Sequence, residues 1–449
     1  MTKPLQQDFT QGNILKQLIT FSGPLILANL LQTSYQLIDS LWVGNLIGDD
    51  ALGSVSISST IIFIVLAFVL GINNAQLTIL SQQRGKDSED GLRRYLNAFV
   101  VILSILAIVM GILGFFFAEL LLNLIGTPKE MVAGAKTYLQ INFLGIIFLV
   151  GYNFISTVLR SLGDSKTPLR IVALAVSLNI VLDPLFISGF NFGIAGAAYA
   201  TIVSQALSFL IGLYFILKRG LAPFSVPFLP KKEEVKLILN LGIPGGLQST
   251  IFSTGSAAIM SVVTSFGPAV VAGYSAAQRI DSLIMLPAHA LGTAVNSMAG
   301  QNIGKGNMKR VNQIAKTAIL YNFAIMTALG LFVIAFGRYG VVLFISEEEA
   351  IQFGTRFIQI IALTFPFLGI NFVLNGIVRA SGAMYQVLVL NIISFWVLRV
   401  PLSALFANLF GEVGIAIGMG TSFIISSVLA FLYFKYGKWR ERVLFKESN

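Results

Sequence analysis

The chain has 449 residues, of which 55% are hydrophobic and 11% charged. Soluble domains carry roughly 25% charged residues, so this composition indicates a polytopic membrane protein. The absence of cysteine excludes disulfides and cysteine metal sites, and the single histidine excludes a histidine-rich metal centre. The formal charge of +10 does not indicate nucleic-acid binding, because the basic residues lie in short loops between apolar runs.

Twelve apolar runs follow one another along the chain, each long enough to cross a bilayer as a helix. Strands of a membrane barrel would alternate in polarity, and these runs do not. The sequence therefore predicts an all-α membrane protein with twelve transmembrane helices. The predicted spans are 16–44, 51–80, 95–122, 131–159, 168–188, 194–217, 237–266, 272–300, 313–337, 350–378, 386–406 and 414–434.

Basic residues collect on one side of the predicted helices. With those near the two ends of the chain, they account for 24 of the 30 Lys and Arg residues. The opposite loops hold Lys129, Lys136 and Arg338, together with seven acidic residues. Positively charged loops remain in the cytoplasm. We therefore expect a multi-pass protein of the cell (inner) membrane with both termini in the cytoplasm.

The longest loop on the basic side, 218–236, contains three prolines and many charges. Such a composition is typical of a linker between domains. The sequence therefore predicts an N-terminal lobe at 1–217 with spans 1–6, a cytoplasmic linker at 218–236, and a C-terminal lobe at 237–449 with spans 7–12 and a cytoplasmic tail.

The two predicted lobes repeat each other in sequence at a nearly constant offset. An even number of spans in each repeat means that both halves point the same way, so the repeat is parallel. Transport sites in such folds lie near the interface between the repeats. The matching positions are 82–86 with 301–305, 160–163 with 379–382, 193–196 with 414–417, and Pro24 with Pro244.

Span 1 carries a polar stripe that ends in a carboxylate. Asn29, Gln32, Gln36 and Asp39 follow at steps of three and four, which place them on one helical face. An ionisable group within the membrane usually marks a transport pathway. Pro24 removes a backbone hydrogen bond and favours a bend. Span 1 is therefore interpreted as a moving, ion-responsive helix; the alternative is that Asp39 is a satisfied structural group.

Span 5 carries the second intramembrane carboxylate, Asp183, one turn after Asn179. The predicted topology places Asp39, Asp183, Tyr138 and Thr201 in the outer half of the N-terminal lobe, where one cavity could hold all of them. Two nearby carboxylates cannot both ionise cheaply, so the pair is expected to hold a proton. With amide and hydroxyl oxygens they could instead bind sodium, and these residues alone do not choose between the ions.

The second repeat lacks this carboxylate pair. Asp39 aligns with Ile259 and Asp183 aligns near Val400, so ion coupling is expected in the first half. Four ionisable residues in spans 8 and 11 are interpreted mainly as structural, with their individual roles open: Arg279, Asp281, His289 and Arg399.

The run GPLILANLLQTSYQLIDSLWVG, the segment NFISTVLRSLGDSKTP and the duplicated Gln-x-x-Gly-Lys loops resemble the multidrug and toxic compound extrusion (MATE) family, most closely its DinF-like branch. The resemblance covers nearly the whole chain and implies a V-shaped arrangement of two six-helix lobes that export drugs by cation coupling. In the family's proton model, the helix bends at the Pro24 position when the Asp39 position is protonated. The cation site implied by the family lies at Asp39, Asn179, Asp183 and Thr201, with Tyr138 and Asn153 nearby.

One departure narrows the resemblance. NorM-like members carry acidic residues in the membrane helices of the C-terminal lobe, whereas Ile259 and the run 361–370 carry none here. This difference argues for the DinF-like branch and against a cation site in the second lobe.

The predicted function is proton-coupled export of amphipathic organic cations, with sodium as the alternative ion. Soft methionine and flat aromatic side chains suit such substrates. Candidate substrate contacts are Gln32, Tyr35, Gln36, Phe154, Met260, Met285 and Asn371. We expect a monomer surrounded by lipid, with no cofactor, no bound metal other than a possible sodium ion, and no nucleic-acid partner.

Other classes of function fit less well. A lipid-linked-precursor flippase of the wider superfamily should line its cavity with several basic residues, but few basic residues besides Arg279, Arg356 and Arg399 lie within spans. No phosphate-binding loop motif is present, which argues against direct ATP drive. An enzyme is disfavoured because no catalytic motif appears.

Overall fold

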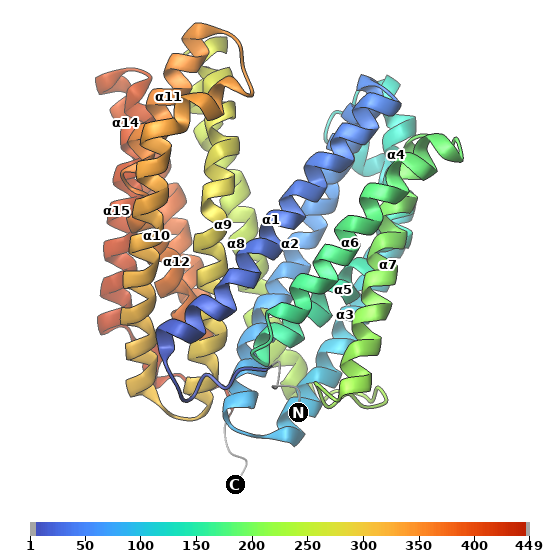
Figure 1. Cartoon of the computed structure of the whole chain (residues 1–449), viewed down its shortest axis with the longest axis vertical. Helices are drawn as coiled ribbons and strands as arrows, with labels where there is room; N and C mark the ends of the chain where they lie inside the picture. The colour runs from blue at the N-terminus through green and yellow to red at the C-terminus, as the bar shows by residue number, and fades with distance from the viewer. Residues whose placement is uncertain (1–5, 446–449) are drawn as a thin grey trace. The chain divides into compact units, whose positions relative to one another are not determined.

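The computed structural model describes residues 6–445, and every regular element in that range is a helix. Lipid offers no hydrogen-bond partners, so apolar spans satisfy their backbone groups internally by forming helices. The first repeat contains α1 (Ile14–Leu46), α2 (Asp49–Gly85), α3 (Glu89–Leu124), α4 (Lys129–Leu144), α5 (Ile146–Ser161), α6 (Lys166–Pro184), the π-helix η1 (Leu185–Gly189) and α7 (Ile194–Arg219) (Figure 1).

The second repeat follows the same order. It contains α8 (Lys232–Thr264), α9 (Pro268–Gly304), α10 (Met308–Val342), α11 (Glu348–Ala362), α12 (Phe365–Ala380), α13 (Met384–Ile392), the π-helix η2 (Ile393–Arg399), α14 (Val400–Phe410) and α15 (Val413–Tyr436), and ends in the 3₁₀ helix η3 (Lys438–Glu441).

The prediction of twelve spans is confirmed. Within residues 6–445, eight helices are long and apolar enough to cross a membrane, and two bent pairs supply one span each. Two further long helices, α8 and α9, are less apolar and occupy the positions of the predicted spans 7 and 8.

The bends occur at equivalent places in the two repeats. The pair α4–α5 turns by 52° at Gly145, and the pair α11–α12 turns by 53° at Leu363 and Thr364. Gly145 and Thr364 are separated by the same offset as the matching segments 82–86 and 301–305. The sequence repeat therefore extends to the break in the fourth span of each half.

Close helix packing follows the same repeat. A Cβ added to Gly111 of α3 would lie 2.9 Å from the carbonyl oxygen of Phe143, and one added to Gly330 of α10 would lie 2.7 Å from that of Ala362. The two glycines are equivalent under the offset of the repeat, and so are the two carbonyls. Glycine at these positions lets two backbones approach where no side chain fits.

The chain packs as two compact units. Unit 1 contains Gly23–Gly246 and the stretch that ends at Asp8, and unit 2 contains Phe9–Ser22 and everything from Leu247 onward. Two of the three changes of unit fall inside continuous helices, α1 and α8, close to Pro24 and Pro244. The lobes expected at 1–217 and 237–449 describe the sequence repeat and remain a prediction, whereas the units describe packing.

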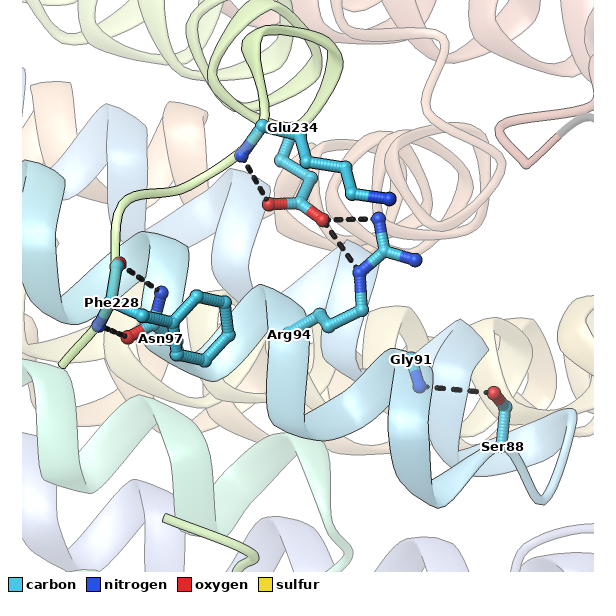
Figure 2. Close-up of polar contacts among 7 residues, drawn as sticks. Ser88, Gly91, Arg94, Asn97, Phe228 and Glu234 are labelled. Atoms are coloured by element: carbon cyan, nitrogen blue, oxygen red, sulfur yellow. Dashed lines mark hydrogen bonds and ion pairs between the residues drawn. The ribbon is translucent and has the colours of Figure 1, made fainter. Parts of the chain in front are cut away.

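The segment before α8 is fastened to α3 in unit 1 (Figure 2). The Asn97 side chain donates to the Phe228 carbonyl at 2.7 Å and accepts from its N–H at 2.9 Å. Arg94 donates through Nε, at 2.8 Å, and Nη2 to one carboxylate oxygen of Glu234, a side chain that is 2% exposed. The other carboxylate oxygen accepts from the Lys231 N–H at 2.9 Å.

The segment before α1 is held in a comparable way in unit 2. Phe9 is the equivalent of Phe228 under the offset of the repeat, and it is fully buried. Its N–H donates to the Gln301 side chain at 3.1 Å, and its carbonyl accepts from Asn302 at 3.0 Å and from Arg310 at 2.8 Å. The segment that leads into each repeat is thus bound through the backbone of a phenylalanine by polar side chains.

Candidate ion-coupling site

The polar stripe of α1 divides between a buried carboxylate and exposed amides. Asp39 is 8% exposed and faces the interior of unit 1, whereas Gln32 and Gln36 are exposed. The hydroxyl of Tyr35, one turn before Asp39, donates to the Thr201 hydroxyl on α7 at 3.1 Å. Tyr35 and Asp39 therefore lie on the side of α1 that faces the interior of unit 1, and the hydrogen bond from Tyr35 places Thr201 next to this site.

The second carboxylate is placed by the end of α6. Asn179 and Asp183 are fully buried, and Asn179 Nδ2 donates to Asp183 Oδ1 at 2.9 Å. Pro184 has no N–H to continue the α-helical pattern, and the backbone widens into η1 directly after it. A π-helical turn of this kind changes the direction in which nearby side chains point.

The two carboxyl groups meet. Asp39 and Asp183 lie within hydrogen-bonding reach of each other. Asp39 Oδ1 and Asp183 Oδ2 are buried and find no donor among residues 6–445. An ionised carboxylate only accepts hydrogen bonds, so the pair must share a proton to bond directly. Alternatively, a small cation between the oxygens could satisfy both groups.

Two tyrosines complete the surroundings of this pair. Tyr138 of α4 is 4% exposed, and the charges of Asp39 and Asp183 act on both Tyr138 and Tyr35. Tyr152 of α5 also interacts electrostatically with Tyr35. Sequence reasoning did not select Tyr152, because a lone tyrosine in an apolar run gives no sign of its facing.

Asn153 points elsewhere. Its side-chain amide donates to the carbonyl of Leu149 on its own helix at 2.9 Å, and no hydrogen bond found within the described range joins it to either carboxylate. Asn153 is therefore not hydrogen-bonded to the carboxyl pair in this conformation, and its part in cation binding stays a prediction.

An apolar cluster packs inside unit 1 one turn beyond Asp39. Val43 of α1, Val55 of α2, Tyr138 and Ile141 of α4, and Ile187 of η1 pack together there. Apolar packing on this side keeps water from the carboxyl pair, which strengthens their electrostatic interaction.

The side chains expected to contact substrate differ in how exposed they are. Gln32 and Gln36 are exposed, and Tyr35 and Asn371 are half-buried. The other three pack inside their own units: Phe154 against the ring of Phe224 at 6.1 Å, and Met260 and Met285 in the apolar core of unit 2. Asn371 accepts a hydrogen bond from Asn375 one turn later on α12.

Three of the four residues left open in the second half, Arg279, His289 and Arg399, lie against aromatic rings. The His289 ring lies against that of Phe372, with centroids 4.3 Å apart and the planes tilted by 52°, and Arg279 lies over the ring of Phe344 at 5.3 Å. In the described part of the chain, no three His, Cys, Asp or Glu side chains are grouped as metal ligands would be.

Comparison with known proteins identifies the family. The MatE family model matches residues 24–185 and again 244–405, once in each repeat. The chain belongs to the MatE family. The resemblance noted in the sequence is thereby confirmed, as is the fold of two parallel six-helix repeats.

Relatives and solved structures agree with the MatE assignment. The probable multidrug resistance protein YpnP of Bacillus subtilis is 59% identical over 98% of this chain and 99% of its own length. The probable multidrug resistance protein NorM of Thermotoga maritima is 27% identical over 96% and 94%. A crystal structure of MATE in complex with MaL6 is 25% identical, covers 97% and 98% of the two chains, and has a TM-score of 0.90.

Membership of the MatE family sets the broad class of function. The chain is an integral multi-pass membrane transporter of the multidrug efflux class and not an enzyme. Transporters of this family act on small molecules and need no prosthetic cofactor.

Proposed function

We propose that this MatE transporter exports amphipathic organic cations in exchange for protons, by alternating access. The observation that carries the proposal is the contact between Asp39 and Asp183 inside unit 1, supported by Asn179 on one side and the Tyr35–Thr201 pair on the other. A shared proton stabilises this contact, and its loss leaves two adjacent negative charges that repel each other.

This change of charge supplies two states that an ion can select. Proton uptake removes the repulsion between α1 and α6, and proton release restores it. An organic cation favours the deprotonated state, so cation binding and proton release are coupled. In this structure α1 runs as one helix through Pro24. We propose that α1 bends there as the charge on Asp39 changes.

Sodium coupling is the alternative, and one observation favours it. Asn179 Oδ1 is buried without a donor within the described residues. Together with Asp39, Asp183 and Thr201 it could complete an oxygen-ligand set for sodium. A sodium site requires both carboxylates to be ionised, so the two mechanisms predict different products of drug binding.

A direct experiment separates the ions. Dye efflux would be measured in proteoliposomes under a pH gradient alone and under a sodium gradient alone. Efflux with the pH gradient alone, together with proton release when drug binds purified protein, is the expected result. Sodium release without proton release would overturn the proton mechanism.

We further propose that the protein acts as a monomer of the DinF-like type in the cell membrane, with both termini in the cytoplasm. The distribution of basic loops supports this orientation. The predicted lobes, 1–217 and 237–449, would then be the two halves that alternate in access.

A further inference from the structure

The fifth span of the second repeat buries a cation where the first repeat buries a carboxylate. Arg399 ends η2, two residues before Pro401, and is 6% exposed. Asp183 directly precedes Pro184, after which η1 begins in the first repeat. Each repeat thus places one charge at a π-helical turn beside a proline, and the two charges have opposite signs.

Two aromatic rings lie against the Arg399 guanidinium. Its central carbon lies 3.7 Å from the ring centroid of Phe395 and 4.5 Å from that of Phe423. Its Nε donates one long hydrogen bond, of 3.4 Å, to the Ser422 hydroxyl. A guanidinium has five N–H donors. No second hydrogen bond and no ion pair of Arg399 is found within residues 6–445.

A carboxylate lies near Arg399 without touching it. Asp281 of α9 and Arg399 influence each other electrostatically, and both influence Tyr274. No ion pair within 4.0 Å joins them, and Asp281 Oδ1 is buried without a donor among the described residues. The two charges are thus held apart inside unit 2.

A purely structural role does not account for this arrangement. A buried charge is costly unless it is paired and hydrogen-bonded, and aromatic faces alone offset part of that cost. The same chain contains a structural arginine for comparison: Arg94 binds Glu234 through two nitrogens (Figure 2). Arg399 instead keeps most of its donors free, as expected of a group that receives a ligand.

We propose that Arg399 is a binding site in unit 2 for the carboxylate of an exported amphiphile, with Ser422 and the two phenylalanines fixing the guanidinium. A planar guanidinium matches the geometry of a carboxylate. Asp281 weakens the attraction for anions, so compounds that carry both charges are favoured over simple anions. This inference rests on the proposed export of organic cations and assigns Arg399 to the carboxylate of those exported compounds that also carry a negative charge.

Two dyes with one chromophore provide the test. Rhodamine 6G is a cationic ethyl ester, and rhodamine 19 is the corresponding free acid. Binding of each would be measured by fluorescence anisotropy with purified protein in phosphatidylcholine nanodiscs. Loss of a charged hydrogen bond predicts that Arg399→Gln weakens rhodamine 19 binding by about tenfold or more but rhodamine 6G binding by less than about twofold. Arg399→Lys should retain part of the preference.

Asp281→Asn supplies a change of opposite sign. It removes the nearby negative charge, so the preference for rhodamine 19 over rhodamine 6G should increase. This variant tests the proposal even if Arg399→Gln fails to fold. An unchanged ratio of the two affinities in Asp281→Asn, or an equal loss of both dyes in Arg399→Gln, would overturn it.

Two further results are informative. If wild-type protein binds neither dye, the proposed export of organic cations fails, independently of Arg399. Phosphatidylglycerol added to the nanodiscs should leave the preference for rhodamine 19 unchanged. If it abolishes that preference, Arg399 binds a lipid headgroup and the assignment to a substrate carboxylate is wrong.

Discussion

Replacing Asn179 with alanine should weaken drug binding and shift proton release to higher drug concentrations. Asn179 Nδ2 donates to Asp183 Oδ1 at 2.9 Å, and both side chains are fully buried. A hydrogen bond to a charged group contributes about 1.5–3 kcal/mol. The variant therefore destabilises the ionised state of Asp183 by this amount. Drug binding, which requires that state, should weaken by about tenfold to a hundredfold.

The assay is a drug titration of purified protein in weakly buffered solution, with a pH indicator reporting released protons. Gln140→Ala is the matched control, because the Gln140 amide lies in the same unit but donates to the backbone carbonyl of Phe115, at 3.2 Å. It should release protons at wild-type drug concentrations. If Asn179→Ala does the same, Asp183 does not exchange the coupling proton, and the reasoning is refuted.

Three other predictions follow from the fold and the site. Asp39→Asn should abolish coupled efflux in protein that is inserted and expressed normally; wild-type drug resistance in cells expressing this variant would contradict the assignment of Asp39. Single cysteines at Asp49 and Lys231 should react with an impermeant reagent from opposite sides of the membrane, whereas labelling from one side would mean that the span count is wrong by an odd number. Gly111→Ala should lower the free energy of unfolding by about 1–3 kcal/mol, and with it the thermal midpoint, because the new Cβ would lie 2.9 Å from the Phe143 carbonyl oxygen. Gly23→Ala is the control, since there is open space around Gly23. Equal thermal midpoints of the two variants would contradict the packing argument.

Much of the fold could be predicted from apolar runs and the internal repeat, because lipid leaves a spanning segment few options besides a helix. The one-turn spacing of Asn179 and Asp183 also placed them on one helical face, and the structure joins them by a hydrogen bond. The breaks at Gly145 and Thr364 were not predicted, because an apolar run reads the same whether its helix is straight or bent. The π-helix after Pro184 was missed for a similar reason, since proline indicates that a helix can be disturbed but not how.

The hydrogen-bond partners and the burial of individual side chains were harder to predict than the positions of the spans. Tyr35 was expected to contact substrate, yet its hydroxyl donates to Thr201. Gln36 shares the predicted stripe with Asp39 but is exposed, whereas Asp39 is buried. Periodicity identifies a polar face, but tertiary packing determines which part of that face meets another helix.

The first part of α1 and the first part of α8 each pack in the opposite unit, and this exchange affects where the chain can be cut into two polypeptides. The start of α1 belongs to unit 2, and the start of α8, from Lys232 to Gly246, belongs to unit 1. A gene cut within 218–236 would produce two polypeptides, each missing a helical piece of its own unit and carrying a piece of the other. Neither product should mature alone, and co-expression should rescue both. Although the two halves of the chain share one repeated pattern, each half therefore supplies a helical segment that the other half needs in order to fold.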